Sequence, residues 1–344
     1  MWQIVTSILW TALGLFSCRF IPSHFPKLLG RILYWVGVPL QILALARQSD
    51  FTQSLWCPPL TTSLVLILGL GLALVSLSGL KRLSHYWIST LRRRSRCKRI
   101  TGKTIDQSPS WIPWLSQVFA LIRTVLPIQR SAQGSFVLAS MLGNTGYVGL
   151  AIAPTLVNHV YLSWIVIYGV VHNLLGSYGL GVILAHRFGC SHSGKNWLEH
   201  LQIIFCVPAL WAFALGWLSR PFTFPAQLEA GLQISLWFVI PSAFLLIGMQ
   251  LSKLKGLESL QVALVPVAIK MLVLPGLTGL GLTLFGISGD ARLALVLMSG
   301  MPTAFANLIL AEEYNLDSQL AASSILISTL GFPMMIPLWL TVFH

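Results

Sequence analysis

Long apolar runs separated by short polar segments recur along the whole chain. Each run holds about 20 residues, the length that an α-helix needs to cross a bilayer at a rise of about 1.5 Å per residue. The runs are rich in Leu, Val, Ile and Gly and lack the strict alternation of a membrane β-barrel. We predict ten membrane-spanning helices, at residues 3–20, 28–46, 57–80, 134–156, 160–185, 200–218, 229–251, 260–285, 291–311 and 320–342.

The composition agrees with a membrane protein. Of the 344 residues, 55% are hydrophobic and 9% are charged, whereas about a quarter of the residues of a soluble domain are charged. The five cysteines are scattered without a Cys-x-x-Cys pair, so neither a disulfide framework nor a zinc site is predicted. We expect an all-α membrane protein with no metal and no other cofactor.

The distribution of Lys and Arg predicts the orientation, because these residues prefer the cytoplasmic ends of spans. If the segment after the third helix is cytoplasmic, eighteen of the 22 Lys and Arg residues lie on that side, three lie on the other side, and Lys270 lies within a helix. Ten helices then put both termini outside. We expect a multi-pass protein of the cytoplasmic (inner) membrane.

One insert, residues 81–130, holds many of the basic residues, above all in the run KRLSHYWISTLRRRSRCKR within 81–103. We expect this run to lie as a cytoplasmic loop near anionic lipid headgroups. Nucleic acid, the alternative partner, is not expected beside ten membrane spans. The apolar, Trp-rich residues 109–128 are interrupted at Pro113, which favours an interfacial helix over an eleventh span.

Short motifs recur in the same order, five predicted helices apart. The matched pairs are WVGVP (35–39) with WFVIP (237–241), GLGLAL (69–74) with GLGLTL (279–284), and NTGYVGLAIA (144–153) with PTAFANLILA (302–311). Because five is odd, the second copy must be inverted in the membrane, an arrangement typical of secondary transporters. We predict a first repeat at 1–186 and a second at 187–344.

Helix-weakening residues interrupt the fourth and ninth predicted helices at equivalent places. They are Gly143, Gly146 and Gly149 in the fourth helix, and Gly300 with Pro302 in the ninth. Unwound backbone is tolerated at membrane depth where it is buried in protein or lines a cavity, so the two breaks predict a site near the midplane. For any single glycine, close helix packing is the alternative interpretation.

Other polar or kinking residues lie at membrane depth. Pro39 and Pro241 occupy equivalent positions and are predicted to kink the second and seventh helices, and Gln41 is predicted to face the cavity beside Pro39. His172 and Asn173 form a polar pair midway along the fifth helix. The histidine could carry a proton near neutral pH; an interhelical hydrogen bond is the interpretation that we favour.

Several motifs resemble the auxin efflux carrier family of the bile-acid/arsenite transporter superfamily, which includes plant PIN-type carriers and bacterial malonate or malate permeases. The motifs are GNTGYVGLAIAP (143–154), IPSAFLLIGMQL (240–251), MPTAFANLILAEEYNLD (301–317) and ASSILISTLGFPMMIPLWL (322–340). The resemblance implies two inverted five-helix repeats, crossing broken helices four and nine, and organic-anion transport by a crossover domain that moves against a scaffold.

The same resemblance implies a first crossover at Asn144 and Thr145 and a second at Met301, Pro302 and Thr303. Plant auxin carriers have a proline beside the asparagine at both crossovers and a long loop between helices five and six. Here the first crossover lacks proline and that loop, near 187–199, is short. Auxin itself is therefore not the expected substrate.

Lys270, about ten residues into the eighth helix, has no carboxylate near its depth in the sequence. A cation there usually faces a cavity or a partner, so we expect either a substrate anion or backbone carbonyls at a helix break to balance its charge. The residues predicted to bind substrate are Asn144, Thr145, Gly146, Tyr147, Pro302, Thr303, Asn307, Lys270 and Gln41.

These features predict a secondary transporter of small organic anions that works by alternating access. An anion channel or a non-transporting membrane sensor of the same fold is the alternative. No catalytic motif, phosphate-cradling loop or paired intramembrane carboxylates are found, so an enzyme is not expected. A homodimer is compatible with the sequence, which does not decide the oligomeric state.

Overall fold

The computed structural model describes residues 2–17, 19–22, 24–51, 54–101, 127, 129–189, 207–252 and 259–343. Within these ranges the chain is helical and has no β-strand beyond one isolated bridge. The predicted interfacial helix at 109–128 lies outside the described residues, except for Pro127. The helices before the first interruption are α1 (Trp2–Ser17), α2 (Phe25–Ile32), the π-helix η1 (Leu33–Gly37), α3 (Val38–Gln48), α4 (Cys57–Thr101) and α6 (Arg130–Met141).

The remaining elements follow the first interruption. They are η2 (Thr145–Gly149), α7 (Leu150–Ile152), η3 (Ala153–Thr155), η4 (His159–Tyr161), α8 (Leu162–Val171), η5 (His172–Gly181), α9 (Val182–Phe188), α11 (Pro208–Leu218), α12 (Ala226–Leu251), α13 (Leu260–Ala268), η6 (Ile269–Val273), α14 (Leu274–Leu284), α15 (Gly289–Ser299), α16 (Ala306–Glu313) and α17 (Ser318–Phe343).

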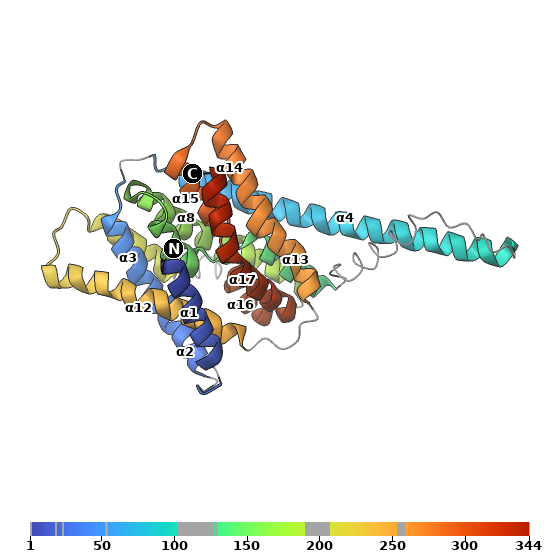
Figure 1. Ribbon diagram of the computed structural model, residues 1–344, viewed down its shortest axis with the longest axis horizontal. Helices are drawn as coiled ribbons and strands as arrows, with labels where there is room; N and C mark the ends of the chain where they lie inside the picture. The colour runs from blue at the N-terminus through green and yellow to red at the C-terminus, as the bar shows by residue number, and fades with distance from the viewer. Residues whose placement is uncertain are drawn as a thin grey trace.

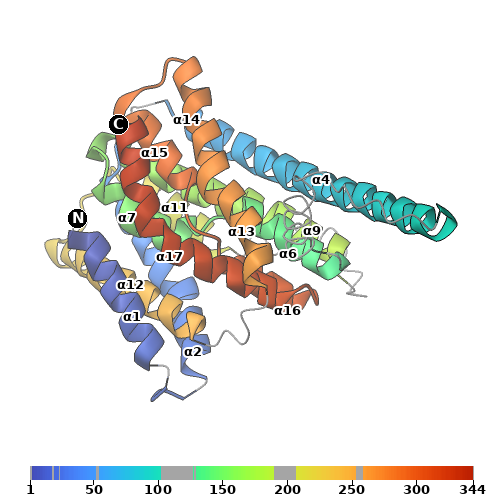
Figure 2. The same ribbon diagram turned by 45° about the vertical axis from the view of Figure 1, so that its right-hand side comes forward.

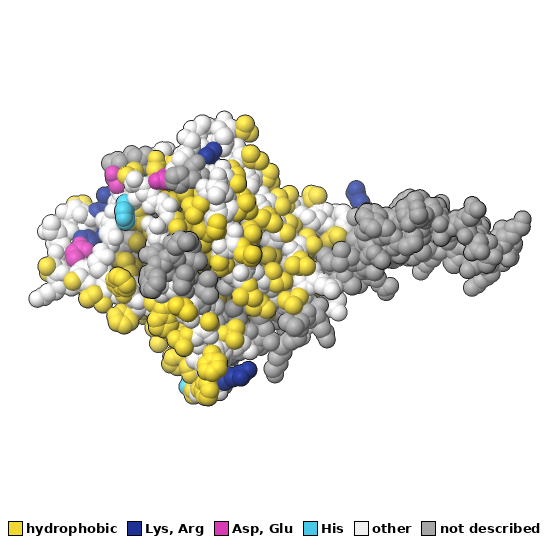
Figure 3. Space-filling model, in the orientation of Figure 1, with side chains coloured by type: hydrophobic (Ala, Val, Ile, Leu, Met, Phe, Trp, Pro, Cys, Tyr) yellow, Lys and Arg dark blue, Asp and Glu magenta, His cyan; other side chains and the backbone are white. Residues whose placement is uncertain are grey.

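Six helical stretches are long and apolar enough to cross a membrane. They are Phe25–Gln48, Cys57–Arg82, His159–Phe188, Ala226–Gln250, Leu260–Leu284 and Ser318–Phe343. Large apolar side chains on them are exposed, including Trp237 at 80% and Leu284 at 87%. Figure 3 shows hydrophobic side chains spread over the described part of one face, with the few charged groups towards its ends. Such a surface suits contact with lipid.

The basic insert does not begin as the loop that the sequence analysis predicts. α4 continues through residues 81–101 as one helix of 45 residues, and Figure 1 shows it projecting far from the rest of the molecule. Residues 81–101 contain neither Gly nor Pro and are rich in Arg, so nothing ends the helix where the apolar run stops. The membrane-spanning part of α4 is thus extended by a basic helix.

The helices pack as two groups, which Figures 1 and 2 show side by side. We call α1, α2, η1, α3, α11 and α12 the panel, because α1 packs along α12 and α11 along α3. We call α4, α6 to α9 and α13 to α17 the crossing bundle, in which α4 contacts α6 and α13 contacts α17. Each group contains helices from before and after residue 186. The two packed groups therefore do not correspond to the two predicted repeats.

Very close backbone contact joins α1 to α12 in the panel. A Cβ added at Gly248 would lie 1.9 Å from the carbonyl oxygen of Thr11, and one at Gly14 would lie 2.1 Å from that of Leu245. Small residues allow such approach in membrane helices. An ion pair between Arg47 of α3 and Glu229 of α12 ties the far ends of the panel helices together.

Two helices of the crossing bundle are interrupted, as the glycine and proline pattern predicts. α6 ends at Met141 and helical structure resumes at Thr145, while α15 ends at Ser299 and α16 begins at Ala306. The segments between them meet in an antiparallel bridge of Gly143 and Thr303. The Asn144 N–H donates to the Pro302 carbonyl at 2.7 Å, and the Ala304 N–H donates to the Leu142 carbonyl at 3.0 Å. The unwound segments therefore provide hydrogen-bond partners for some of each other's backbone N–H and C=O groups.

The two prolines predicted as hinges are accommodated differently. Pro39 follows η1, so the helix carries a π-helical segment directly before it. Pro241 lies inside α12, which remains α-helical from Ala226 to Leu251. π-Helical segments also occur at η2, η5 and η6, and together these four segments hold many of the predicted site residues. Such segments are frequent at functional sites.

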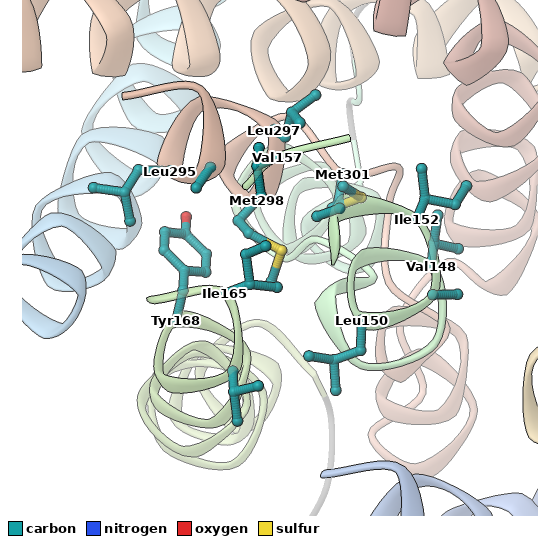
Figure 4. Packing of buried hydrophobic residues seen from close by; sticks show 14 of the residues in the cluster. Val148, Leu150, Ile152, Val157, Ile165, Tyr168, Leu295, Leu297, Met298 and Met301 are labelled. Atoms are coloured by element: carbon teal, nitrogen blue, oxygen red, sulfur yellow. The ribbon is translucent and has the colours of Figure 1, made fainter. Parts of the chain in front are cut away.

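Apolar side chains fill the crossing bundle on one side of the bridge. Met298 lies 3.1 Å from where a Cβ of Gly149 would be, and 3.7 Å from that of Gly169 in α8. Figure 4 shows Met298 and Met301 among residues of α8, η2 and α7. The members labelled there are Val148, Leu150, Ile152, Val157, Ile165, Tyr168, Leu295 and Leu297.

Candidate substrate site

A cavity of about 820 Å³ lies between the panel and the crossing bundle. The panel contributes α2, η1, α3 and the end of α12, and the crossing bundle contributes η2, η5, α16 and the start of α17. The lining residues that carry the argument below are Lys27, Arg31, Tyr34, Gly143, Asn144, Gly146, Tyr147, Asn173, Ser177, Tyr178, Phe305, Ala306 and Glu312. The volume suits a small solute.

The first interrupted segment forms the floor of this cavity. Asn144 caps η2, and its Oδ1 accepts from the Tyr147 N–H at 3.2 Å. Asn173 of η5 lies next to Gly146, since a Cβ on Gly146 would be 3.4 Å from Asn173 Nδ2. That nitrogen donates to the Gly169 carbonyl at 3.0 Å. The floor is thus built of neutral amide and phenol groups.

His172 holds the first interrupted segment from behind. It is fully buried, and its Nε2 accepts from the Gly143 N–H at 3.3 Å. Nε2 is therefore the acceptor of the ring, which puts the proton of neutral imidazole on Nδ1, 3.4 Å from Thr145 Oγ1. Thr145 is fully buried and lies outside the cavity lining. The contact joins η5 to the unwound segment after α6.

Lys270 lies behind the floor as well. Its ammonium group is fully buried and donates to the carbonyl of Ser299, the last residue of α15, at 2.5 Å. A Cβ on Gly143 would lie 2.8 Å from Lys270 Cε and 2.9 Å from Nζ, so a larger residue there would displace the end of the lysine side chain. The partial negative charge of a helix C-terminus stabilises a cation there. Lys270 itself is not among the lining residues.

The second interrupted segment reaches the cavity through Ala304, Phe305 and Ala306. Thr303 instead binds its neighbours: its N–H donates to Ser328 Oγ at 3.0 Å, and its hydroxyl donates to the Ala139 carbonyl at 3.5 Å. Pro302 accepts from the Asn144 N–H and does not line the cavity. Hydrogen bonds thus join the two interrupted segments on the side of the floor that faces away from the cavity.

Asn307 and Gln41 are buried without full hydrogen bonding. Asn307 is fully buried in the first turn of α16, and neither Oδ1 nor Nδ2 has a partner among the described residues. Gln41 is 1% exposed in α3, and its Nε2 also lacks a partner in the described part of the chain. Neither residue lines the cavity in this conformation.

The remaining predicted hinge residues lie off the cavity too. Gly149 ends η2 against Met298, and Gly300 caps α15 against Pro275. Both glycines therefore serve close packing at the interruptions.

Backbone donors at the floor are unpaired. Within the described residues, the N–H groups of Gly146, Phe305 and Ala306 have no hydrogen-bond partner, and all three residues line the cavity. The first amides of a helix such as α16 carry partial positive charge. Neutral amides, phenols and unpaired N–H groups can together bind an anionic oxygen.

The sequence analysis missed several lining residues. Tyr178 of η5 donates to the hydroxyl of Tyr34 in η1 at 2.5 Å, which joins the crossing bundle to the panel across the cavity. Lys27 and Arg31 line the cavity from α2. The sequence shows that Lys27, Arg31 and Tyr34 are spaced to lie on one face of a helix. It does not show that this face lies opposite the crossing bundle across a cavity.

The cavity opens towards one end of the bundle. The lining includes Lys27 near the start of α2, Gln250 near the end of α12 and Ser318 at the start of α17. Towards the other end, α3 packs against α8, with Ile42 and Leu45 buried in the core. The described residues contain no group of three or more His, Cys, Asp or Glu that could hold a metal ion.

Comparison with known proteins bears on what such a cavity serves. The family model described as "Membrane transport protein" matches residues 202–340. The chain is also 25% identical over 232 residues to an uncharacterized transporter of Methanocaldococcus jannaschii, an alignment that covers 64% of this chain and 72% of that protein. Both matches are to membrane transporters, which agrees with the resemblance of the chain to the auxin efflux carrier family. These matches and the apolar helices indicate a multi-pass membrane transporter, and the cavity is where a transported solute would bind.

Proposed function

We propose that this protein is a member of the auxin efflux carrier family and a secondary transporter of small organic anions, chiefly carboxylates, in the cytoplasmic membrane. The observation that carries the proposal is the cavity that ends on the two interrupted segments, with unpaired backbone donors on its floor. Pre-arranged donors of this kind suit a carboxylate, which only accepts hydrogen bonds.

The charge near the floor supports an anion as the substrate. Lys270 is fully buried, and no ion pair joins it to a described carboxylate. Its ammonium group lies against Gly143, which lines the cavity. Lys270 would therefore attract an anion through the floor without touching it, because a charge acts over several ångströms in a medium of low dielectric constant.

The proposal includes ten spans in two inverted five-helix repeats. The antiparallel meeting of residues 142–144 with 302–304 supports this arrangement, since the internal alignment pairs Asn144 with Pro302 and so puts both segments at the same point of the two repeats. The panel likewise pairs α2, η1 and α3 with α12, which carry the WVGVP and WFVIP motifs. Inverted repeats of this kind place a substrate site at their interface.

Orientation and movement follow from the charge and the packing. Lys27 and Arg31 belong to the side that is predicted to be cytoplasmic, so the conformation described here would be open to the cytoplasm. Transport would then require the crossing bundle to move against the panel until the cavity opens on the other side. The hydrogen bond between Tyr34 and Tyr178 would have to break in that movement.

Uptake of labelled malate, malonate and related acids by proteoliposomes tests the proposal. We expect saturable uptake by the wild type, and a loss of at least about tenfold for Asn144→Asp, because a carboxylate at the floor would repel the anion at close range. Gln129→Glu is the matched control. Gln129 is exposed at the N-cap of α6, outside the cavity, and should tolerate the same amide-to-carboxylate change.

Two results would contradict the proposal. One is the absence of saturable flux for any acid from a protein that is shown to be folded. The other is an Asn144→Asp variant that transports as well as Gln129→Glu, since the floor would then not be in contact with the solute.

A further inference from the structure

One face of the continuous helix formed by α2, η1 and the start of α3 lines the cavity from its mouth inward. Lys27, Arg31, Tyr34 and Val38 all belong to the lining, and their spacing of four, three and four residues keeps them on the same side of a helix. Along the helix axis, Arg31 is about 4.5 Å and Lys27 about 10 Å from the level of Tyr34 towards the mouth. A solute that enters the cavity passes the two cations before it reaches the tyrosine.

The lipid-facing side of α2 is a different stripe. Leu28, Ile32 and Val36 are 48%, 50% and 51% exposed, and at about 100° per residue they lie about 130° around the helix from the cavity-lining residues. A basic residue that only anchors a helix at the membrane surface would need no place on the cavity face. The position of Lys27 and Arg31 therefore points to a role inside the mouth.

Charge at the mouth is positive and unpaired. Lys27 and Arg31 are exposed, Glu312 is the acidic residue of the lining, and none of the three makes an ion pair with a described residue. An arginine fork binds a carboxylate or a phosphate through two parallel hydrogen bonds, and a neighbouring lysine adds a point charge.

We infer that Lys27 and Arg31 form an outer anion site at the mouth, which captures the carboxylate of the solute before it moves to the floor. This inference rests on the proposed function and adds a second, shallower site to it. The same two cations could instead bind the phosphate of a lipid headgroup, so the test separates these two sources of an anionic oxygen.

The test measures malonate binding to the purified full chain in nanodiscs of phosphatidylcholine, by stabilisation against heat. We expect Arg31→Gln to weaken the apparent affinity about tenfold and Lys27→Gln to weaken it several-fold, while Arg31→Lys keeps most of the binding. Arg19→Gln is the matched control, because Arg19 is exposed on the same side of the molecule and does not line the cavity. Added salt should weaken binding by the wild type more than by Arg31→Gln, since the lost contact is ionic.

Flux in proteoliposomes, measured in parallel, should show a raised KM for Arg31→Gln with an unchanged maximal rate. An affinity of Arg31→Gln equal to that of Arg19→Gln would overturn the inference, and so would a wild type that binds no malonate. A difference that appears only when anionic lipid is added would assign the pair to a headgroup and overturn it too. Malonate binding that depends on Arg31 without any flux would support the outer site while contradicting transport.

Discussion

The ammonium group of Lys270 lies behind the cavity floor and not within it. It binds the terminal carbonyl of α15 and fills the space that a side chain on Gly143 would need. The two expectations raised for this lysine are therefore compatible: a backbone carbonyl holds it, and under the proposal its charge also attracts an anion in the cavity. A Cβ at Gly143 would meet the end of the lysine side chain at less than 3 Å, so a larger residue there would displace the ammonium group.

Replacing Lys270 by methionine keeps most of the volume and removes the charge. At an effective dielectric constant of about 20, a unit charge about 7 Å away attracts a carboxylate by about 2 kcal/mol, so malonate affinity should fall about 10- to 30-fold. Binding measured by calorimetry on folded protein checks this. Lys81→Met is the control, since Lys81 is exposed and bonded to Gln133 outside the cavity. Equal affinities of the two variants would rule out attraction through the floor.

The sequence singled out several residues that line the cavity because one local pattern was enough to mark them, and their binding of substrate stays a prediction. Asn144, Gly146, Tyr147 and Asn173 line the cavity, and each stands in or beside a run of small and polar residues within an apolar helix. The Tyr34 and Tyr178 pair could not be predicted. The two residues are 144 positions apart, and each taken alone is an ordinary tyrosine of a membrane helix.

Helix breaks and helix contacts are the features that matter at the level of elements. Glycine and proline identified the interruptions after α6 and α15 because their effect is local. The continuation of α4 to Thr101 was missed because hydropathy marks where the membrane ends and not where a helix ends. The π-helical segments were not predicted either, since they depend on how neighbouring helices fit.

The contact between α1 and α12 should be the least tolerant of added volume. A Cβ from Gly248→Ala would meet the backbone of Thr11 and Leu15, which cannot turn aside, so we expect a loss of about 1–3 kcal/mol in stability. Gly281→Ala in α14 is the control: nothing lies within 4 Å of its Cβ, and a gain of up to about 1 kcal/mol is expected from helix propensity. Thermal unfolding in detergent measures both. If the Gly248→Ala variant is as stable as Gly281→Ala, the close packing inferred here is wrong.

At the scale of the whole molecule, the panel and the crossing bundle meet around the cavity, and each group is built from both halves of the sequence. The internal matches between the halves predicted equivalent helices but not how these would be grouped. If the proposed mechanism is right, the closed end, where α3 packs on α8, opens as the mouth between α2 and α17 closes. In a channel, both ends of the cavity would be open at the same time. In a sensor, the two ends would not open alternately.

Access to the floor from each side of the membrane tests this mechanism most directly. A cysteine introduced by Tyr147→Cys, with the five native cysteines replaced by serine, is labelled by a membrane-impermeant maleimide from either face of oriented vesicles. Ser252→Cys, at the end of α12, provides a position whose access should stay on the mouth side. Without malonate, we predict that Tyr147→Cys is labelled from the mouth side. When malonate is supplied on the opposite side, we predict new labelling from that side and an equal decrease in labelling from the mouth side. Simultaneous access from both faces, or access from one face alone during saturable flux, would contradict the account.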